Sequence, residues 1–282
     1  MSASPCSVEN AATVASYRCK VAEHYWVNQR YKYIRLEADA PIARITKAGQ
    51  FYQLKCPTSP EHEPFLLRPM SVYGAGPEDN RIEFLYNVTG VGTKAMATLL
   101  EGGHMEIVGP LGNTFTFSAN YRRILVVARG VGLATMAPLI KEAYGAGVDI
   151  TAVMSARSPA DLMEKEFLRG ARADVRSVFD ADGTSSVEAM EVLLRELIEA
   201  QRPDAVYTCG SHRLLMLLQR VLSDYPQITA EVAMEQRMAC GMGVCLSCVR
   251  LFDCDGERKF LRVCREGPVF PIREVVGEVE FG

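Results

Sequence analysis

The residues with the strongest chemical signal in this chain are five of its nine cysteines, which lie close together near the carboxyl end. These five are Cys240, Cys245, Cys248, Cys254 and Cys264. The first three follow the pattern C-x4-C-x2-C, which is typical of a plant-type [2Fe-2S] cluster held by four thiolates. Three ligands on one tight loop need backbone freedom, and Gly241 and Gly243 supply it.

Spacing leaves alternatives open for this cysteine group. A structural zinc site also uses four cysteines, but usually as two short-spaced pairs. Cys254 falls in 253–256, a segment typical of an exposed hairpin turn, whereas Cys264 follows a strand-like stretch at 260–263 that can return to the loop. We therefore predict the cluster ligands to be Cys240, Cys245, Cys248 and Cys264.

A second group, in the first half of the chain, has residue types that hold a flavin dinucleotide. Arg68 can pair with a pyrophosphate, and Ser71 can donate to the flavin edge. Gly90 and Gly92 lead into a predicted helix at 93–100, whose N-terminus favours anions. A solvated strand face and an ordinary loop are the alternatives for these two signals. The predicted flavin contacts are Arg68, Pro69, Met70, Ser71, Tyr73, Tyr86, Asn87, Val88, Gly90, Gly92 and Thr93.

A third group lies at two turns of the second half. A glycine turn, 130–132, follows the apolar run 124–128, where a dinucleotide phosphate is expected in a doubly wound sheet. It is shorter than a full G-x-G-x-x-G and is weak alone. Cys209 and Gly210 end a later predicted strand at the same edge of the sheet. The alternative for Cys209 is a buried cysteine with a structural role only. The predicted dinucleotide contacts are Gly130, Val131, Gly132, Cys209 and Gly210. The four histidines are dispersed, so we predict no catalytic acid or base.

The elements that must position these groups change in character near residue 120. Short strand-like runs at 17–22, 31–37, 51–56 and 82–87 predict an antiparallel β-barrel. Beyond it, strands alternate with helices, which predicts a parallel, doubly wound α/β domain. We predict an FAD-binding barrel at 1–119, an NAD-binding α/β domain at 120–229 and a small C-terminal [2Fe-2S] module at 230–282.

Composition excludes several classes of protein. The net charge of −3 makes nucleic acid an unexpected partner. No apolar run approaches the roughly 18 residues of a membrane span, so we expect no membrane insertion. The first residues lack a basic flank leading into an apolar core, so we expect no secretory signal and a cytoplasmic protein.

Taken in chain order, these groups resemble the ferredoxin-NADP reductase superfamily, in which an FAD-binding barrel precedes an NAD(P)-binding domain. The segments 235–248 and 263–270 look like the electron-transfer subunit of the B-type, NAD-linked dihydroorotate dehydrogenase. That family's Arg-Pro-x-Ser, Gly-x-Gly-Thr and Gly-Val-Gly motifs are matched by Arg68, Pro69, Ser71, Gly90, Gly92, Thr93, Gly130 and Gly132. Two positions depart from the family: Arg129 stands where a glycine is usual, and Tyr73 where smaller residues are common.

The resemblance implies an oxidoreductase subunit of pyrimidine biosynthesis, with electrons passing between NAD(H), FAD, a [2Fe-2S] cluster and a flavin-containing catalytic partner subunit. NAD and NADP stay open, because no acidic residue clearly ends the second strand of the nucleotide domain, and 155–157 suits either. One alternative is an NAD(P)H-dependent reductase component that serves another catalytic subunit or a soluble acceptor. Another is a metal-stapled binding module without redox function.

Overall fold

The computed structural model describes residues 14–58, 61, 63–163 and 165–277. The chain forms two compact units: one comprises Met1–Thr114, Gln236–Val249 and Leu261–Pro268, the other Phe115–Glu235, Arg250–Phe260 and Val269–Gly282. The four predicted cluster ligands all lie in the first unit. The predicted three-domain boundaries stay a prediction, and their ends at 1–13 and 278–282 lie outside the described residues.

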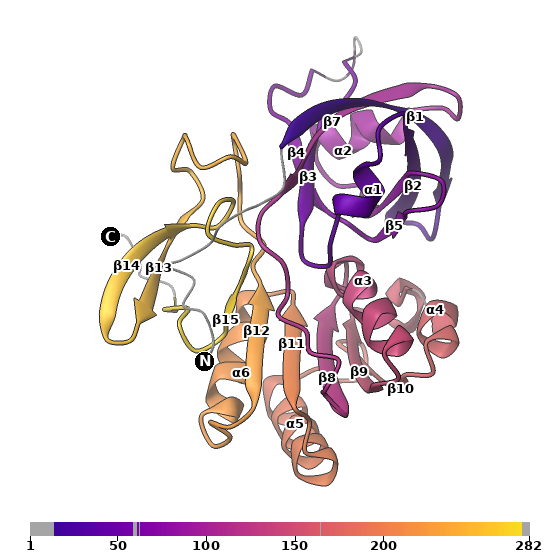
Figure 1. The fold of residues 1–282 in the computed structure, drawn as a ribbon. Coiled ribbons are helices and arrows are strands. Elements are labelled where there is room, and N and C mark those ends of the chain that lie inside the picture. Colours follow the sequence, from indigo (N-terminus) through magenta and orange to yellow (C-terminus); the bar gives the residue numbers. More distant parts are fainter. Residues whose placement is uncertain (1–13, 59–60, 62, 164, 278–282) are drawn as a thin grey trace. The chain divides into compact units, whose positions relative to one another are not determined.

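The first unit is built on a curled, seven-stranded antiparallel sheet (Figure 1). In chain order its strands are β1 (Ala15–Trp26), β2 (Tyr31–Ala38), β3 (Phe51–Leu54), β4 (Arg68–Ser71), β5 (Gly74–Gly76), β6 (Arg81–Asn87) and β7 (His104–Leu111). They are arranged β4-β3-β7-β1-β2-β6-β5. Two short helices, α1 (Ile42–Ile45) and α2 (Val91–Ala97), contribute to its apolar core. The predicted antiparallel barrel is confirmed, and the helix expected at 93–100 begins two residues earlier and ends three residues earlier.

The register of β3 and β4 decides which side chains share a face. Phe51 pairs with Ser71 and Gln53 with Pro69. The alternate pairs are 52 with 70 and 54 with 68. Directly opposed residues point to the same face of a sheet. The side chains at 52 and 54 belong to the barrel core. Gln53 and Ser71 therefore face outward together, and β4 is an edge strand.

The second unit has a doubly wound sheet with β10-β9-β8-β11-β12 parallel and β15 antiparallel at one edge. Its elements are β8 (Arg123–Arg129), α3 (Gly132–Gly145), β9 (Asp149–Ala156), η2 (Pro159–Asp161), α4 (Lys165–Gly170), β10 (Asp174–Phe179), α5 (Val187–Gln201), β11 (Ala205–Cys209), α6 (His212–Leu222), β12 (Thr229–Ala233) and β15 (Val269–Pro271). Strand order reverses between β8 and β11, which is where such sheets bind ligands. The predicted α/β class is confirmed.

The tail also forms a hairpin of β13 (Val249–Cys254) and β14 (Glu257–Arg262). Its turn residues, Asp255 and Gly256, have φ of 56° and 84°. The hairpin was predicted, but the expected exposure of Cys254 was wrong: it is 6% exposed, and its thiol donates to the carboxylate of Glu274. Among the described residues, no helix is both long and apolar enough to cross a membrane.

Candidate cluster and dinucleotide sites

The four predicted cluster ligands come together as two pairs of thiols. The Cys245 N–H donates to Cys240 Sγ at 3.5 Å, and the Cys264 N–H donates to Cys248 Sγ at 3.4 Å. The first pair is accessible, with Cys245 exposed, whereas the second pair is buried. A [2Fe-2S] cluster needs two thiolates on each of its two irons, so this pairing fits the predicted cluster.

Backbone amides of the cysteine loop point at these sulfurs. The N–H groups of Met242 and Val244 each donate to Cys240 Sγ at 3.4 Å. The N–H of Gly243 donates to Cys264 Sγ at 3.1 Å. Such bonds stabilise negative charge on sulfur, which is the charge that a thiolate-held cluster carries.

The cysteine loop is packed on the outer face of the barrel strand β3. Gln53 is fully buried, and its Nε2 donates to the carbonyl of Ala239 at 3.4 Å. A Cβ at Gly241 would lie 2.8 Å from Gln53 Cγ, and φ is +70° there, so both space and conformation require glycine. Gln53 Oε1 is buried without a hydrogen-bond partner in the described structure. Unpaired buried acceptors are rare in folded proteins, and one beside a cofactor loop is available to a donor in the loaded protein.

The segment that carries the fourth ligand is also attached to the barrel. Just after β7, the Asn113 N–H donates to the Gly267 carbonyl at 2.7 Å. The Asn113 side-chain amide donates to the Glu266 carbonyl at 2.9 Å. Cys264 therefore reaches the loop from the barrel side, whereas Cys254 belongs to the other unit.

The two thiol pairs differ in their electrostatics. The hydrogen bond with the Ser247 hydroxyl, 3.2 Å away, lowers the pKa of the Cys245 thiol. Burial raises the pKa of the Cys264 thiol.

Within the described part of the chain, no three His, Cys, Asp or Glu side chains converge on one point as a single-ion site would require. The arrangement is two pairs of sulfurs.

The candidate pyrophosphate site is formed where Arg68 meets the start of α2. A Cβ at Gly92 would lie 2.6 Å from Arg68 Cζ, so only glycine lets the guanidinium lie over this turn. The guanidinium donates to the Leu66 and Leu67 carbonyls. The first N–H groups of a helix have no partner within it. A guanidinium and free amides at one place suit an anion, which fits the pyrophosphate of FAD.

The other predicted flavin residues divide into free and occupied groups. Among the described residues, the half-buried Ser71 hydroxyl makes no hydrogen bond and remains available. Thr93 Oγ1 already accepts from the N–H groups of Thr89 and Gly90, so it braces the turn. Tyr86 is 1% exposed and its hydroxyl is bonded to His24 Nε2 at 2.8 Å, so it belongs to the barrel interior.

The remaining positions of this group lie along the same two strands. Pro69 is opposite Gln53, and Met70 packs on the barrel core. Tyr73 makes an edge contact with Tyr33, with ring centroids 6.1 Å apart. Asn87 ends β6, and the next residue, Val88, packs partly on the core. The geometry thus brings Arg68, Gly92 and the α2 turn together at one end of β4, and leaves Ser71 at the other.

In the second unit, the predicted turn follows β8 at the carboxyl edge of the sheet. Gly130 has φ of +55°. A Cβ at Gly132 would lie 2.9 Å from the carbonyl carbon of Cys209, so α3 begins in direct contact with the end of β11. Val131 precedes α3 at this turn, and Gly210 follows β11. The structure therefore brings the two predicted dinucleotide turns together.

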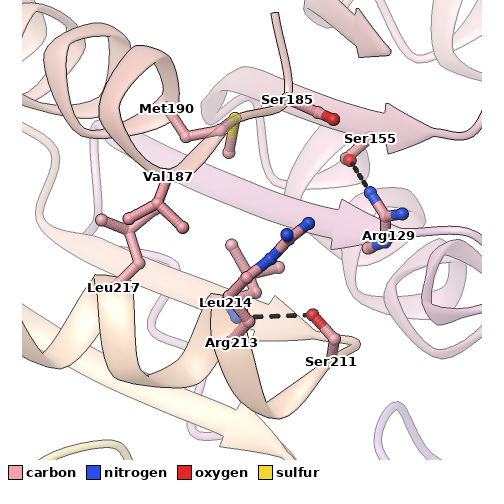
Figure 2. Close-up of a pocket in the computed structure, with 9 residues that line it drawn as sticks. All are labelled: Arg129, Ser155, Ser185, Val187, Met190, Ser211, Arg213, Leu214 and Leu217. Carbon is pink, nitrogen blue, oxygen red and sulfur yellow. Dashed lines mark hydrogen bonds between the residues drawn. The ribbon is translucent and has the colours of Figure 1, made fainter. Parts of the chain in front are cut away.

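Arg129, the unusual residue before this turn, contacts residues at the ends of two neighbouring strands, and Figure 2 shows its contact with Ser155. Its guanidinium donates to Ser155 Oγ at 2.7 Å and to both carboxylate oxygens of Asp180, at 3.1 and 2.6 Å. The hydrogen bond from Arg129, and to a lesser extent the one from Ser185, lowers the pKa of Asp180 to about 2. Arg129 and Ser155 line a pocket in this unit. Ser211 and Arg213, at the start of α6, line the same pocket, as Figure 2 shows. Hydroxyls and two guanidinium groups at the carboxyl edge of a doubly wound sheet suit the ribose or phosphate of a dinucleotide.

Glu235 is a candidate that the sequence prediction missed as a site residue. It follows β12, and its Oε1 lies 3.9 Å from Cys209 Sγ. The Cys209 thiol is also 3.5 Å from Thr135 Oγ1 on α3. Burial raises the pKa of Cys209, which keeps the thiol protonated. The sequence signal for Glu235 was its place directly after a strand at the carboxyl edge of the sheet, beside the dinucleotide turn.

Comparison with solved structures supports the fold. An NADH-dependent reduced ferredoxin-NADP oxidoreductase gives a TM-score of 0.77 at 23% identity, over 92% of this chain and 90% of that one. A ferredoxin reductase in carbazole 1,9a-dioxygenase gives 0.63 at 17% identity, over 78% and 70%. Both similarities concern the fold alone.

Comparison of sequences identifies the family. Residues 235–276 match the family described as the iron-sulfur cluster binding domain of dihydroorotate dehydrogenase B. The chain is 29% identical to the dihydroorotate dehydrogenase B (NAD(+)) electron transfer subunit of Desulforamulus reducens, over 93% of this chain and 98% of that protein. It is 31% identical to the subunit of the same name from Streptococcus thermophilus, over 81% and 86%. The chain therefore belongs to the family of dihydroorotate dehydrogenase B electron transfer subunits.

Proposed function

We propose that this chain is an iron-sulfur flavoprotein subunit that transfers electrons between NAD(H) and a partner oxidoreductase subunit. The observation that carries the proposal is the packing of two cysteine pairs on the outer face of β3, which Ser71 of β4 shares. This packing joins the predicted cluster ligands and the predicted flavin strand within one compact unit.

For FAD, Arg68 and the first amides of α2 would bind the pyrophosphate, and the free Ser71 hydroxyl would hydrogen-bond the flavin edge. The cradle at Gly92 supports this assignment, because any side chain there would displace the guanidinium. Pro69 shares the outer face of β4 with Ser71, whereas Met70 faces the barrel core; Tyr73 follows just after the strand. When bound, FAD exchanges an electron pair with a nicotinamide and single electrons with a [2Fe-2S] cluster.

For the nicotinamide dinucleotide, the turn 130–132 and the end of β11 would form the binding edge. Gly130 and Gly132 let a phosphate approach the backbone at the start of α3. Arg129 and Arg213 would face the ribose end of the dinucleotide. Glu235 lies beside Cys209, where its carboxylate can orient a polar group of the bound ligand.

For the partner, the exposed end of the cysteine loop offers a docking surface. Cys245 is exposed, and so are the apolar side chains of Met242, Val244 and Leu246 around it. Apolar groups beside the accessible thiol pair suit close contact with a protein that exchanges electrons there. By the name of its relatives, we propose that the partner is a flavin-containing dihydroorotate dehydrogenase subunit, and that the complex is cytoplasmic.

The proposal is tested by purifying the native complex without oxygen. We expect about one FAD and about two irons per chain, as a four-thiolate [2Fe-2S] site requires, together with a copurifying flavoprotein that oxidises dihydroorotate. Stoichiometric zinc in place of iron would contradict the cluster assignment. If the chain is fully active without a second subunit, or copurifies with a different oxidoreductase, the reductase-component alternative is supported.

A further inference from the structure

The cysteine loop, residues 240–248, receives a hydrogen bond from a cationic side chain outside it. Arg262, at the end of β14, donates from its guanidinium to the carbonyl of Gly243 at 3.0 Å. The nitrogen of that same peptide belongs to Val244, and its N–H donates to Cys240 Sγ at 3.4 Å. A guanidinium, a peptide and a predicted ligand sulfur are therefore connected in series.

Hydrogen bonds in series strengthen one another, because each donor polarises the group that it contacts. A cation at the carbonyl end makes the N–H at the other end a better donor. We propose that Arg262 is a positioning residue that raises the reduction potential of the cluster through the Gly243–Val244 peptide. The inference rests on the proposed function, because it needs a cluster on these cysteines.

Glu266 holds Arg262 in place for this contact. Its carboxylate accepts from Arg262 Nε at 3.1 Å and from the Arg262 backbone N–H at 2.7 Å. The two residues flank Cys264, so the same ion pair closes the turn that carries the fourth ligand. Arg262 thereby connects the two segments that carry the cysteines, one through Gly243 and the other through Glu266.

Positive charge beside the cluster should raise its reduction potential. One-electron reduction adds a negative charge that is shared by the irons and the sulfurs of the cluster. Hydrogen bonds to sulfur and nearby positive charge both stabilise that charge and raise the potential. Loss of the guanidinium should lower the potential. Glu266→Gln removes a negative charge while its amide oxygen can still accept from Arg262, so it should raise the potential.

Arg265 provides a matched control. It carries the same charge in the same turn, and a Cβ at Gly243 would lie 3.2 Å from its Cγ. Among the described residues, its guanidinium makes no hydrogen bond or ion pair. Any effect of net charge alone should appear equally in Arg262→Gln and Arg265→Gln.

The experiment is a redox titration of the purified holoprotein, followed by the electron paramagnetic resonance of the reduced cluster. We expect Arg262→Gln to lower the midpoint potential of the cluster by about 59 mV, which for one electron is a tenfold change in the ratio of reduced to oxidised cluster. Arg265→Gln should shift it less, Arg262→Lys should recover part of it, and Glu266→Gln should raise it. Exchangeable-proton couplings to the cluster should weaken in Arg262→Gln.

Iron and FAD contents are measured for every variant, which separates this inference from the proposed function. Wild-type protein without iron would refute the proposed function itself. With the cluster present, equal shifts in Arg262→Gln and Arg265→Gln would overturn the inference, and so would a lowered or unchanged potential in Glu266→Gln. If Arg262→Gln does not retain iron, Arg262→Lys and Glu266→Gln decide the matter by the same signs.

Discussion

The contact between Arg68 and the α2 turn makes a quantitative prediction about FAD affinity. In Arg68→Ala, the pyrophosphate would lose one charge-assisted hydrogen-bonding partner, worth about 1.5 to 3 kcal/mol. Since about 1.4 kcal/mol is a tenfold change in an equilibrium constant, the dissociation constant of FAD should rise by roughly 10-fold to 150-fold. The guanidinium's own contacts are with the Leu66 and Leu67 carbonyls, so its loss should cost the barrel little.

The assay is a fluorescence titration of flavin-free protein with FAD. Arg44→Ala is the matched control, because Arg44 is an exposed arginine of the same unit whose guanidinium makes no hydrogen bond or ion pair with the described residues. Gly92→Ala tests the geometry, since its Cβ would displace the Arg68 side chain without removing its charge. It should also weaken FAD binding.

An unchanged FAD affinity in Arg68→Ala would refute the pyrophosphate assignment. The same weakening in Arg44→Ala would reduce the effect to net charge. Thermal unfolding of the flavin-free variants completes the comparison, because a loss of affinity that follows a loss of stability would place Arg68 in the barrel structure.

Three further predictions concern other residues. Cys254→Ser should retain the cluster and Cys264→Ser should lose it, as measured by iron content; the opposite outcome would reassign the fourth ligand. Gln53→Leu removes an unpaired buried acceptor and also the bond to the Ala239 carbonyl, so the stability of flavin-free, iron-free protein should change by no more than about 1 kcal/mol, yet iron loss from the holoprotein should speed up; unchanged iron loss would refute its role in the loop. Arg129 lowers the Asp180 pKa from 3.8 to about 2, so the stabilisation it adds is present above pH 3.8 and lost toward pH 2. Asp180→Asn should cost at most about 1 kcal/mol at neutral pH, because the pair is partly exposed, and a deficit that persists at pH 2 would contradict this.

Much of the fold could be predicted because local patterns and tertiary structure agree. The run at 124–128 is apolar throughout because β8 is central in its sheet and is covered on both faces. The glycines that predicted a phosphate turn at 130–132 lie where α3 meets β11, a contact that admits no side chain at Gly132. The C-x4-C-x2-C spacing indicated the ligand loop because the ligands are local in sequence.

What could not be predicted depends on contacts between distant residues. Gln53 and Ala239 are 186 residues apart, and no periodicity announces that a barrel strand supports the cysteine loop. The 253–256 pattern correctly indicated a turn, but the direction of the Cys254 side chain depends on strand register, in which one residue reverses the face. Arg129 was visible as a departure from the family, yet its ion pair with Asp180 required the neighbouring strand ends to be placed.

The central claim is that the cysteine loop relays electrons between the flavin and a partner, and Cys245→Ser tests it most directly. The measurement is paired: NADH-dependent reduction of an artificial acceptor that takes electrons from flavin, and substrate turnover by the reconstituted complex. We predict that the first activity persists with FAD bound, while the second is abolished because the exposed thiol pair has lost a ligand. Partner turnover that survives in Cys245→Ser would show that electrons bypass the cluster, and would contradict the claim.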